Sequence, residues 1–474
     1  MNHLTFTIPI FNLGTLRHPY GMSSAPEGHL LRETAERAVS YLGKLENRPV
    51  APTKEDLKNL DQLPKKLPER PTPADDVIEM LDRLGSPATV ASNGSRYFGF
   101  VIGSTLLAAL AADWLTSTWN QNGVAEVLSP VATRLEGMAV GWIKELMGLP
   151  TEVEGAFVSG ATMANFAGLA AARHSVLAQS GWDFEKRGMN GAPKVTVISG
   201  EEIHASAVKA LMMLGFGTES LIRLPIDDEG RIKPQSLPAI RGPTIVCVQA
   251  GNVNSGSFDP FKPLIEWAHE GGAWVHVDGA FGLWAAASPR YRHLTAGVDR
   301  ADSWSTDCHK WLNVPYDSGL VMVRDPVQLR GALANPYAPY IAGDFLKDRA
   351  DYAPEMSRRA RGVDAWAALM SLGRVGMADL VDRCCHHASK FAKLLSDGGC
   401  EILNDVVLNQ VLVSFGSDEA TQRVINAIQA DGTCWCGGTK WHGRAAMRIS
   451  VSSGKTTDED VERSARAMLR LAKA

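Results

Sequence analysis

The chain has 474 residues, too many for one compact domain, so we expect two or three. Hydrophobic residues make up 45% and charged residues 21%, which is typical of a folded globular protein and excludes extensive disorder or a bundle of membrane-spanning helices. The formal net charge is −4, with Lys and Arg spread along the chain, so we expect no nucleic-acid partner.

The beginning of the chain indicates neither export nor membrane insertion. The stretch "MNHLTFTIPIFNLGTLRHPYG" lacks the basic start and unbroken apolar core of a secretory signal. The longest uncharged run, residues 97–112, is shorter than the roughly 18 apolar residues of a spanning helix, and we expect it to be buried core. Seven cysteines, an odd number, suggest reduced thiols and a cytoplasmic location, and Cys434 and Cys436 favour a structural role over metal binding.

Residues 1–95 are expected to form an N-terminal arm. Within it, residues 49–75 are rich in proline and charge and contain no apolar face long enough for a core element. The first strong helical pattern follows at "SPVATRLEGMAVGWIKELMG", with Pro130 suited to the first turn. Its helical spacing predicts an apolar face made of Val131, Leu135, Met138, Trp142, Ile143 and Leu146.

A large α/β domain is expected over residues 96–365. Short apolar runs alternate there with helical stretches: "KVTVIS" at 194–199, "TIVCVQA" at 244–250, "AWVHVD" at 273–278 and "GLVMV" at 319–323. This alternation predicts a largely parallel sheet covered on both faces. Because such sheets bind ligands beyond the carboxyl ends of their strands, polar residues directly after these runs are the candidates for function.

A smaller α+β domain is expected over residues 366–474. A long helical segment leads into the strand-like stretches "CEILN", "NQVLVSFG" and "AMRISVS". The final helix begins with Thr457 and Asp460 in the spacing of a capping box.

Four polar sites follow predicted strands. In "SGATMAN", residues 159–165, small residues precede the helix "FAGLAAAR". Free backbone N–H groups at this helix start can cradle a phosphate, and the alternative is that these residues form an ordinary tight turn. His204 in "GEEIHAS" is a candidate ring-stacking residue or a helix cap. Asp278 ends an apolar strand, which is costly unless a cation or donor meets it, and the alternative is a cap or ion pair. Lys310 in "DCHKWLN" is a candidate Schiff-base nucleophile, since a lysine in apolar surroundings loses basicity.

Together these sites provide a phosphate cradle, an aromatic ring, an acid and an amine from strand ends of one sheet. That combination suits pyridoxal phosphate, which needs a lysine for its aldehyde and an acid for its pyridine nitrogen.

At this point the sequence resembles the group II pyridoxal-phosphate-dependent decarboxylases, which include aromatic amino acid and glutamate decarboxylases. The resemblance covers roughly residues 95–455 through "SPVATRLEGMAVGW", "SGATMANFAGLAAAR", "EEIHAS", "HVDGAFG" and "DCHKWLN", of which the last two are the most specific. It implies fold type I, with a mostly parallel seven-stranded sheet flanked by helices and a smaller C-terminal α+β domain. It also implies a homodimer with the active site at the interface.

The resemblance implies a role for each matching residue. Lys310 matches the Schiff-base lysine, Asp278 the partner of the pyridine nitrogen, and His204 the histidine that stacks on the ring. Other matches are Gly160, Ala161, Thr162 and His309, which contact the phosphate, and Ala280, which packs against the ring. The implied reaction is decarboxylation of an L-amino acid, with an aromatic substrate favoured.

The resemblance also implies a tyrosine acid C-terminal to the lysine. Tyr340 in "NPYAPYIAG" has about the right spacing, with Tyr337 as competitor, and a tyrosine here favours amine formation over the aldehyde-forming variant. One departure concerns Asp307, where many relatives have an asparagine that donates to the phosphate. Either Asp307 turns away or Thr306 and Ser305 replace it, and whether Asn252 or Asn254 reaches the cofactor stays open.

Substrate selection is less constrained. A family segment matching "RYFGFVIG" approaches the substrate from the partner subunit, so Tyr97, Phe98 and Phe100 are pocket candidates, although we expect at least two of them to pack in the core. An acidic substrate would need cations, and the candidates are Arg358, Arg359 and Arg361, for which the alternative is ion pairing at the surface.

Other functions stay open at this stage. They are another pyridoxal reaction (carbon-carbon lyase, aldehyde synthase or aminotransferase), a catalytically inactive structural relative, and a metal hydrolase using His309, His386 and His387. No H-E-x-x-H or similar spacing occurs, so we expect no metal.

Overall fold

The computed structural model describes residues 26–334 and 349–473, which belong to two compact units. The N-terminal unit ends at Ala91 and the main unit begins at Ser92, close to the boundary expected after residue 95. The N-terminal unit contains α1 (Pro26–Lys44), α2 (Lys54–Asn59), α3 (Ala74–Met80) and α4 (Ser86–Ala88). A capping box of Thr53 and Asp56 starts α2, which buries none of its side chains, as expected for a stretch without an apolar face.

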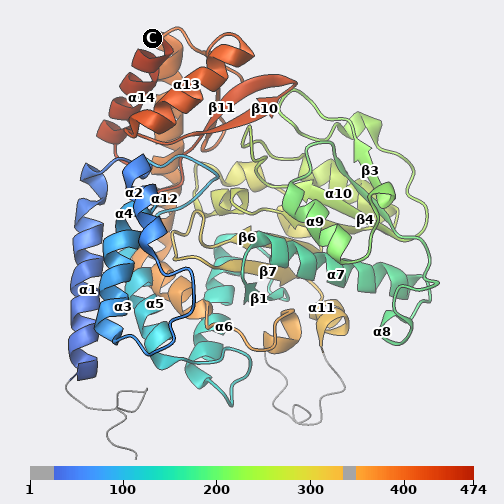
Figure 1. Ribbon diagram of the computed structural model, residues 1–474. Helices are drawn as coiled ribbons and strands as arrows, with labels where there is room; N and C mark the ends of the chain where they lie inside the picture. Colours follow the sequence, from blue (N-terminus) through green and yellow to red (C-terminus); the bar gives the residue numbers. More distant parts are fainter. Residues whose placement is uncertain (1–25, 335–348, 474) are drawn as a thin grey trace, which may run out of the picture. The chain divides into compact units, whose positions relative to one another are not determined.

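The main unit is built around a seven-stranded sheet (Figure 1). Its strands are β1 (Glu154–Val158), β2 (Thr196–Gly200), β3 (Leu221–Leu224), β4 (Thr244–Gln249), β5 (Trp274–Asp278), β6 (Ser303–Asp307) and β7 (Gly319–Val323). Their order is β1-β7-β6-β5-β4-β2-β3, and β7 alone runs antiparallel to its neighbours. The expectation of a largely parallel sheet is therefore confirmed.

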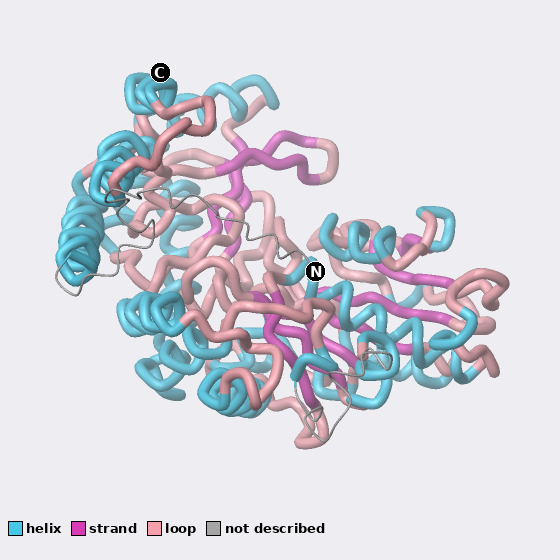
Figure 2. The backbone as a smooth tube through the Cα atoms, turned by 60° about the horizontal axis from the view of Figure 1, so that its bottom comes forward, coloured by secondary structure: helices cyan, strands magenta, loops and turns pink. Residues whose placement is uncertain are grey.

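Helices cover both faces of this sheet (Figure 2). They are α5 (Leu107–Trp119), α6 (Pro130–Leu146), α7 (Ala161–Gln179), α8 (Phe184–Arg187), α9 (Ala205–Met213), α10 (Phe261–Glu270) and α11 (Pro326–Leu333). Alternate residues of a strand point to opposite faces. In β4, Val246 and Val248 join the core beneath α6 and α10, whereas Ile245 and Cys247 join the core beneath α7 and α9.

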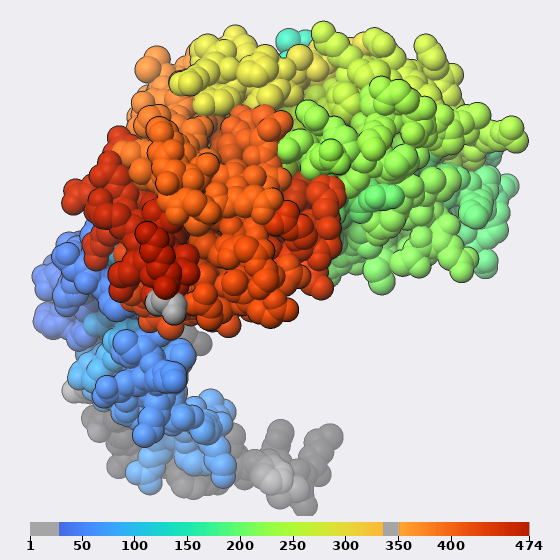
Figure 3. Space-filling view, turned by 90° about the horizontal axis from the view of Figure 1, so that it is seen from above, coloured from blue at the N-terminus to red at the C-terminus, as the bar shows by residue number. Residues whose placement is uncertain are grey.

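A second sheet lies in the C-terminal part of the main unit. It has the order β10-β11-β9-β8 and is antiparallel, with β8 (Glu401–Ile402), β9 (Gln410–Ser414), β10 (Gly437–Trp441) and β11 (Arg444–Ser450). The accompanying helices are α12 (Gly362–Asp397), α13 (Asp418–Asp431) and α14 (Asp458–Ala472). The predicted capping box of Thr457 and Asp460 does start α14. We propose that residues 366–474, orange to red in Figure 3, form the smaller domain.

The amphipathic helix and the buried run at 97–112 are both confirmed in outline, but part of each predicted apolar set is exposed. In α6 the buried residues are Ala132, Glu136, Ala139, Val140 and Ile143, whereas the predicted face includes Val131 and Met138, which are exposed. In the uncharged run at 97–112, Phe98 and Val101 are buried, but Phe100 and Leu107 are 62% and 71% exposed. Hydrophobic spacing identifies an apolar stripe, and it does not tell which partner covers that stripe.

Strands β3 and β10 were not predicted, and β6 was expected only as the strand-like segment before Lys310. The pattern of β6 is polar because Ser303, Ser305 and Asp307 alternate with Trp304 and Thr306, yet all five residues are buried. Polar side chains are tolerated inside a sheet when hydrogen bonds satisfy them.

All seven cysteines carry free thiols, and Cys434 and Cys436 are buried. None of the helices in the described ranges combines the length and apolar composition needed to cross a bilayer.

Candidate active site

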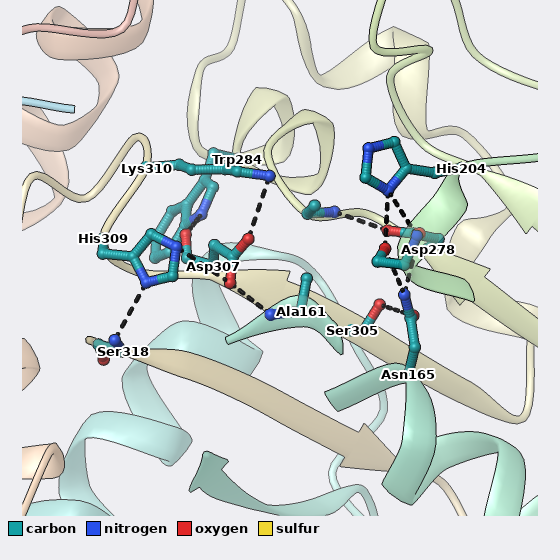
Figure 4. A network of polar contacts seen from close by, with 12 residues as sticks. Ala161, Asn165, His204, Asp278, Trp284, Ser305, Asp307, His309, Lys310 and Ser318 are labelled. Atoms are coloured by element: carbon teal, nitrogen blue, oxygen red, sulfur yellow. Dashed lines mark hydrogen bonds and ion pairs between the residues drawn. The ribbon is translucent and has the colours of Figure 1, made fainter. Parts of the chain in front are cut away.

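The predicted site residues come together at one edge of the large sheet. Strands β1, β2, β5 and β6 run in the same direction, since β7 reverses the direction twice between β6 and β1. Their carboxyl ends carry Gly160, Ala161 and Thr162 after β1, His204 after β2, Asp278 and Ala280 at the end of β5, and His309 and Lys310 after β6. In Figure 4, Lys310 and His309 lie on one side of the site, and His204 and Asp278 lie on the other.

The loop after β1 ends in the N-terminus of α7. Gly160 is the N-cap, and the helix begins at Ala161, earlier than the expected start at Phe166. The first N–H groups of a helix have no helical partners and attract negative charge. A Cβ on Gly319 would lie 2.5 Å from the Cα of Gly160, so these two backbones approach at a distance that only glycine permits. Gly160, Ala161 and Thr162 can therefore hold an anion.

Asp307 adopts neither of the two arrangements expected for it. Its Oδ1 accepts a 2.6 Å hydrogen bond from the backbone N–H of Ala161, and its Oδ2 lies 3.1 Å from Nζ of Lys310. Among the described residues Thr306 Oγ1 has no hydrogen-bond partner, and Ser305 Oγ donates to Asn165, so neither side chain replaces the missing asparagine. The carboxylate thus points at the helix terminus that is proposed to hold a phosphate.

His309 is held with one nitrogen directed at this cradle. Its Nδ1 accepts from the backbone N–H of Ser318 at 3.0 Å, which leaves the hydrogen on Nε2, 3.5 Å from Asp307 Oδ1. Tyr316 stacks on the ring with centroids 4.3 Å apart. Burial lowers the pKa of His309, so the neutral ring offers a single N–H to an acceptor.

Asp278 and His204 occupy the opposite side of the site. The Asp278 carboxylate is 7% exposed and accepts hydrogen bonds from Asn165 Nδ2 at 3.0 Å and from the Ala280 N–H at 3.2 Å. His204 caps α9, and its Nδ1 accepts from the N–H of Ser206. Burial lowers the pKa of His204 despite the nearby Asp278 charge. His204 thus caps a helix, as the alternative expectation for it stated, and the same side chain is still placed beside Asp278 in the site.

These groups fit pyridoxal phosphate with one exception. A helix N-terminus and a histidine N–H suit a phosphate, a lysine suits the aldehyde, and a buried carboxylate suits a protonated pyridine. The exception is Asp307, whose charge repels an anion at the same N–H groups.

We expect Asp307→Asn to bind pyridoxal phosphate about tenfold more tightly, because the substitution removes a buried negative charge next to the phosphate position. The dissociation constant is measured by titrating cofactor-free protein and following its fluorescence. Asp299→Asn, at an exposed position of the same unit, is the control and should leave the constant unchanged. Unchanged or weaker binding by Asp307→Asn would contradict the repulsion.

The three arginine candidates for an acidic substrate all have partners. Arg358 is buried and forms a two-pronged ion pair with Glu136, while its Nη1 also donates to the carbonyl of Phe157. Arg359 pairs with Asp113 and Arg361 with Asp317. The expected alternative of surface pairing is wrong for Arg358, which pairs in the interior, and none of the three offers a free cation to a substrate.

The aromatic candidates divide as expected. Tyr97 and Phe98 are buried, whereas Phe100 is exposed. Tyr97 and Phe100 both stack on Trp435, with centroids 5.1 and 5.5 Å apart. A Cβ on Gly103 would lie 1.8 Å from the carbonyl oxygen of Lys310, so this segment passes directly against the lysine.

Two residues near the site were missed. Asn165 contacts Asp278 directly, and Arg448 in β11 acts electrostatically on His204. Burial lowers the pKa of Arg448, whose shortest hydrogen bond runs 3.2 Å to the carbonyl of Val253. The sequence did contain a signal for Arg448, because it is a charged residue inside the otherwise apolar strand "AMRISVS".

The remaining candidates have other roles. Asn252 Oδ1 caps its own turn by accepting from the N–H groups of Asn254 and Ser255. Asn254 accepts from Thr439 and donates to Glu202. Tyr337 and Tyr340 lie outside the described residues.

The metal-hydrolase alternative has no support. Within residues 26–334 and 349–473, the group with metal-ligand geometry is His29, Glu33 and Asp75, which includes none of the three histidines of that hypothesis.

His276, two residues before Asp278, should make folding sensitive to acid. Burial lowers its pKa from 6.5 to about 4, so between these pH values the unfolded chain binds a proton that the folded chain refuses. The neutral His276 therefore contributes about 3 kcal/mol to the free energy of unfolding. This contribution is fully present above pH 6.5 and is lost as the pH falls to 4. Urea unfolding across this range should show a shallower pH dependence for His276→Gln, and the same change at exposed His386 should not alter it. Equal slopes for His276→Gln and the parent protein would contradict this.

Comparisons with known proteins point to one family. The model of the pyridoxal-dependent decarboxylase conserved domain matches residues 55–416. Tryptophan decarboxylase 1 of Oryza sativa subsp. japonica is 27% identical over 471 residues, covering 91% of this chain and 90% of that protein. Phenylacetaldehyde synthase of Petunia hybrida is also 27% identical, over 78% of this chain and 75% of its own length.

A solved structure shows the same fold. The structure of Oryza sativa TDC with PLP and tryptamine superposes with a TM-score of 0.87 at 23% identity, over 95% of this chain and 98% of that one. The family match covers most of the chain and includes the lysine, the aspartate and the helix terminus described above. The chain therefore belongs to the pyridoxal-dependent decarboxylase family.

Proposed function

We propose that this enzyme removes the α-carboxyl group of an aromatic L-amino acid and releases the amine and carbon dioxide. The observation that carries the proposal is the convergence of Lys310, Asp278, His204 and the first turn of α7 at one sheet edge. Pyridoxal phosphate, when bound, supplies an electron-accepting ring to the carbon that loses its carboxyl group.

Each residue then has a defined task. Lys310 would bind the cofactor aldehyde and yield it to the substrate amine, and Asp278 would keep the pyridine nitrogen protonated. His204 and Ala280 would contact the ring, and Gly160, Ala161, Thr162 and His309 would hold the phosphate. Arg448 would add a positive charge that attracts the substrate carboxylate.

The aromatic preference rests on two observations. Phe100 presents an exposed ring stacked on Trp435, in a segment that touches the backbone of Lys310. The three arginines that would have served an acidic substrate are already paired. Tryptophan decarboxylase is also among the relatives.

The direct test is product analysis with a panel of L-amino acids. Purified protein loaded with pyridoxal phosphate is assayed for carbon dioxide and amine with aromatic, acidic and aliphatic substrates. Amine from an aromatic amino acid supports the proposal, and amine from glutamate or aspartate alone overturns the substrate class. If the products are instead an aldehyde, a keto acid or the fragments of carbon-carbon cleavage, with no amine, the protein catalyses a different pyridoxal-dependent reaction.

We propose Tyr340 as the acid that protonates the substrate carbon after carbon dioxide leaves. Tyr340→Phe should lower amine formation about a hundredfold, the size typical of losing a general acid, and raise the share of aldehyde product. Amine and aldehyde are quantified in the same reaction. Tyr337→Phe is the matched control and should retain amine formation. If Tyr337→Phe loses more amine formation than Tyr340→Phe, Tyr337 is the acid instead.

We further propose a homodimer located in the cytoplasm. Several large apolar side chains of α5 and α6 are exposed: Leu107, Trp114, Leu115, Trp119, Val131 and Met138. An apolar surface of this kind favours burial against another subunit. Light scattering of the purified protein measures the mass of the assembly.

The cytoplasmic location rests on the cysteines, because seven free thiols suit a reducing compartment.

A further inference from the structure

The side chain of Asn165 in α7 makes every hydrogen bond that an amide can make. It is fully buried. Its Nδ2 donates to Asp278 Oδ2 at 3.0 Å and to Ser206 Oγ at 3.3 Å. Its Oδ1 accepts from Ser305 Oγ at 2.6 Å and lies 2.9 Å from His276 Nε2 (Figure 4). Two donor and two acceptor positions are all that an asparagine side chain has.

The orientation of this amide is determined by Asp278. A carboxylate only accepts hydrogen bonds, so the Asn165 atom that faces it must be the nitrogen, and Asn165 Oδ1 faces Ser305 and His276. Because Oδ1 only accepts, the hydrogen of the His276 ring is on Nε2, and Nδ1 of the neutral ring accepts from Ser303 Oγ. Ser303 Oγ in turn accepts from Trp274 Nε1. A flipped amide would turn its oxygen toward the Asp278 carboxylate.

The same amide also reaches the second residue of the site. Ser206 Oγ accepts from Asn165 and lies 2.7 Å from His204 Nδ1, to which it donates. The N–H of Ser206 donates to the same His204 nitrogen at 3.2 Å. One side chain thus connects the carboxylate proposed for the pyridine nitrogen to the imidazole proposed for the ring face.

We propose that Asn165 is a positioning residue that orients Asp278 and His204 together, and that Ser305 and His276, the latter backed by Ser303 and Trp274, hold its oxygen in place. The proposal rests on the cofactor roles given above to Asp278 and His204. Its consequence is that the protonation of the pyridine ring depends on an amide that need not touch the cofactor.

Packing between α7 and the sheet supports this assignment. A Cβ on Gly168, one turn after Asn165, would lie 2.7 Å from His276 Cε1 and 2.9 Å from its Nδ1. The helix therefore approaches the imidazole as closely as a glycine allows, which holds the ring in the plane from which it reaches Asn165.

The test compares Asn165→Leu with Asn404→Leu. Asn404 is also buried and satisfied, donating to the carbonyls of Ser255 and Gln410 and accepting from Leu412, but it lies outside the network. Two quantities are measured: the dissociation constant for pyridoxal phosphate and the pH midpoint at which the visible band of the lysine-bound cofactor changes. We expect Asn165→Leu to weaken cofactor binding about 10- to 100-fold and to shift the midpoint, since a hydrogen bond to a buried charge is lost. We expect Asn404→Leu to change neither.

A second pair covers the case in which Asn165→Leu fails to fold. His276→Gln keeps an N–H donor for Asn165, and His276→Leu removes it. A midpoint that shifts in the leucine variant and returns toward the parent value in the glutamine variant supports the proposal. An unchanged midpoint and dissociation constant in the folded variants would overturn it. Failure of the parent protein itself to bind the cofactor would instead overturn the proposed function.

Discussion

Replacing Lys310 by alanine is expected to abolish the visible band of the bound cofactor and to lower decarboxylation at least about a thousandfold. The amine is the group that bonds to the cofactor aldehyde and then yields to the substrate. In the structure its Nζ lies 3.1 Å from Asp307 Oδ2, and the lysine side chain is largely buried. Absorbance before and after borohydride treatment, together with amine release, measures both effects.

The control for this variant is Lys209→Ala, at an exposed lysine of α9 in the same unit. It should retain both the band and the turnover. A Lys310→Ala protein that keeps full activity would remove the basis for the proposed chemistry. A visible band that borohydride removes in that variant, with the reduced cofactor still attached after dialysis, would place the cofactor on a different amine.

Replacing Asp278 by asparagine is expected to lower kcat/KM between about a hundredfold and a thousandfold. Asparagine has nearly the same shape, but it lacks the negative charge that keeps the pyridine nitrogen protonated as carbon dioxide leaves. The Asn165 amide would face a second amide, which relaxes the orientation of both side chains. Steady-state kinetics and the pH dependence of the cofactor band are measured together.

Two further variants separate charge from geometry at Asp278. Asp278→Glu retains the charge but moves it along a longer side chain, so the cofactor band should keep more of its pH dependence than in Asp278→Asn. Asp259→Asn changes a buried carboxylate whose bonds go to the backbone N–H groups of Ile232 and Gln249, and we expect the pH dependence of the band to stay the same. Equal kcat/KM for Asp278→Asn and the parent would show that the ring nitrogen needs no acid here.

Asp307 illustrates why a family pattern has to be read against the structure. The sequence shows that an acid replaces the usual asparagine, and the expectation was that Asp307 turns away or that Thr306 and Ser305 replace it. The structure places Oδ1 on the N–H of Ala161, a residue 146 positions earlier. The Lys310 ammonium and the α7 terminus compensate the charge, and these groups are adjacent only in the folded chain.

Other parts of the site could not be predicted for a similar reason. Arg358 looked like a surface cation in "MSRRARG", yet its partner Glu136 lies 222 positions away and both side chains are buried. Asn165 was part of a recognised motif, but its bond to Asp278 spans 113 positions. No local pattern states which distant group will satisfy a polar side chain.

The sequence by itself determined most of the elements and the alternation of strands and helices, although it missed β3 and β10, because a strand repeats every two residues and a helix every 3.6, and both periods are visible locally. It also determined which residues follow the strand ends, and with them the lysine, aspartate and histidine of the site. The tertiary structure alone decided which face of α6 is buried, where Asp307 points and how Asn165 connects two site residues. These features depend on side chains that meet across the sheet, and their hydrogen-bond partners are chosen by packing rather than by position in the chain.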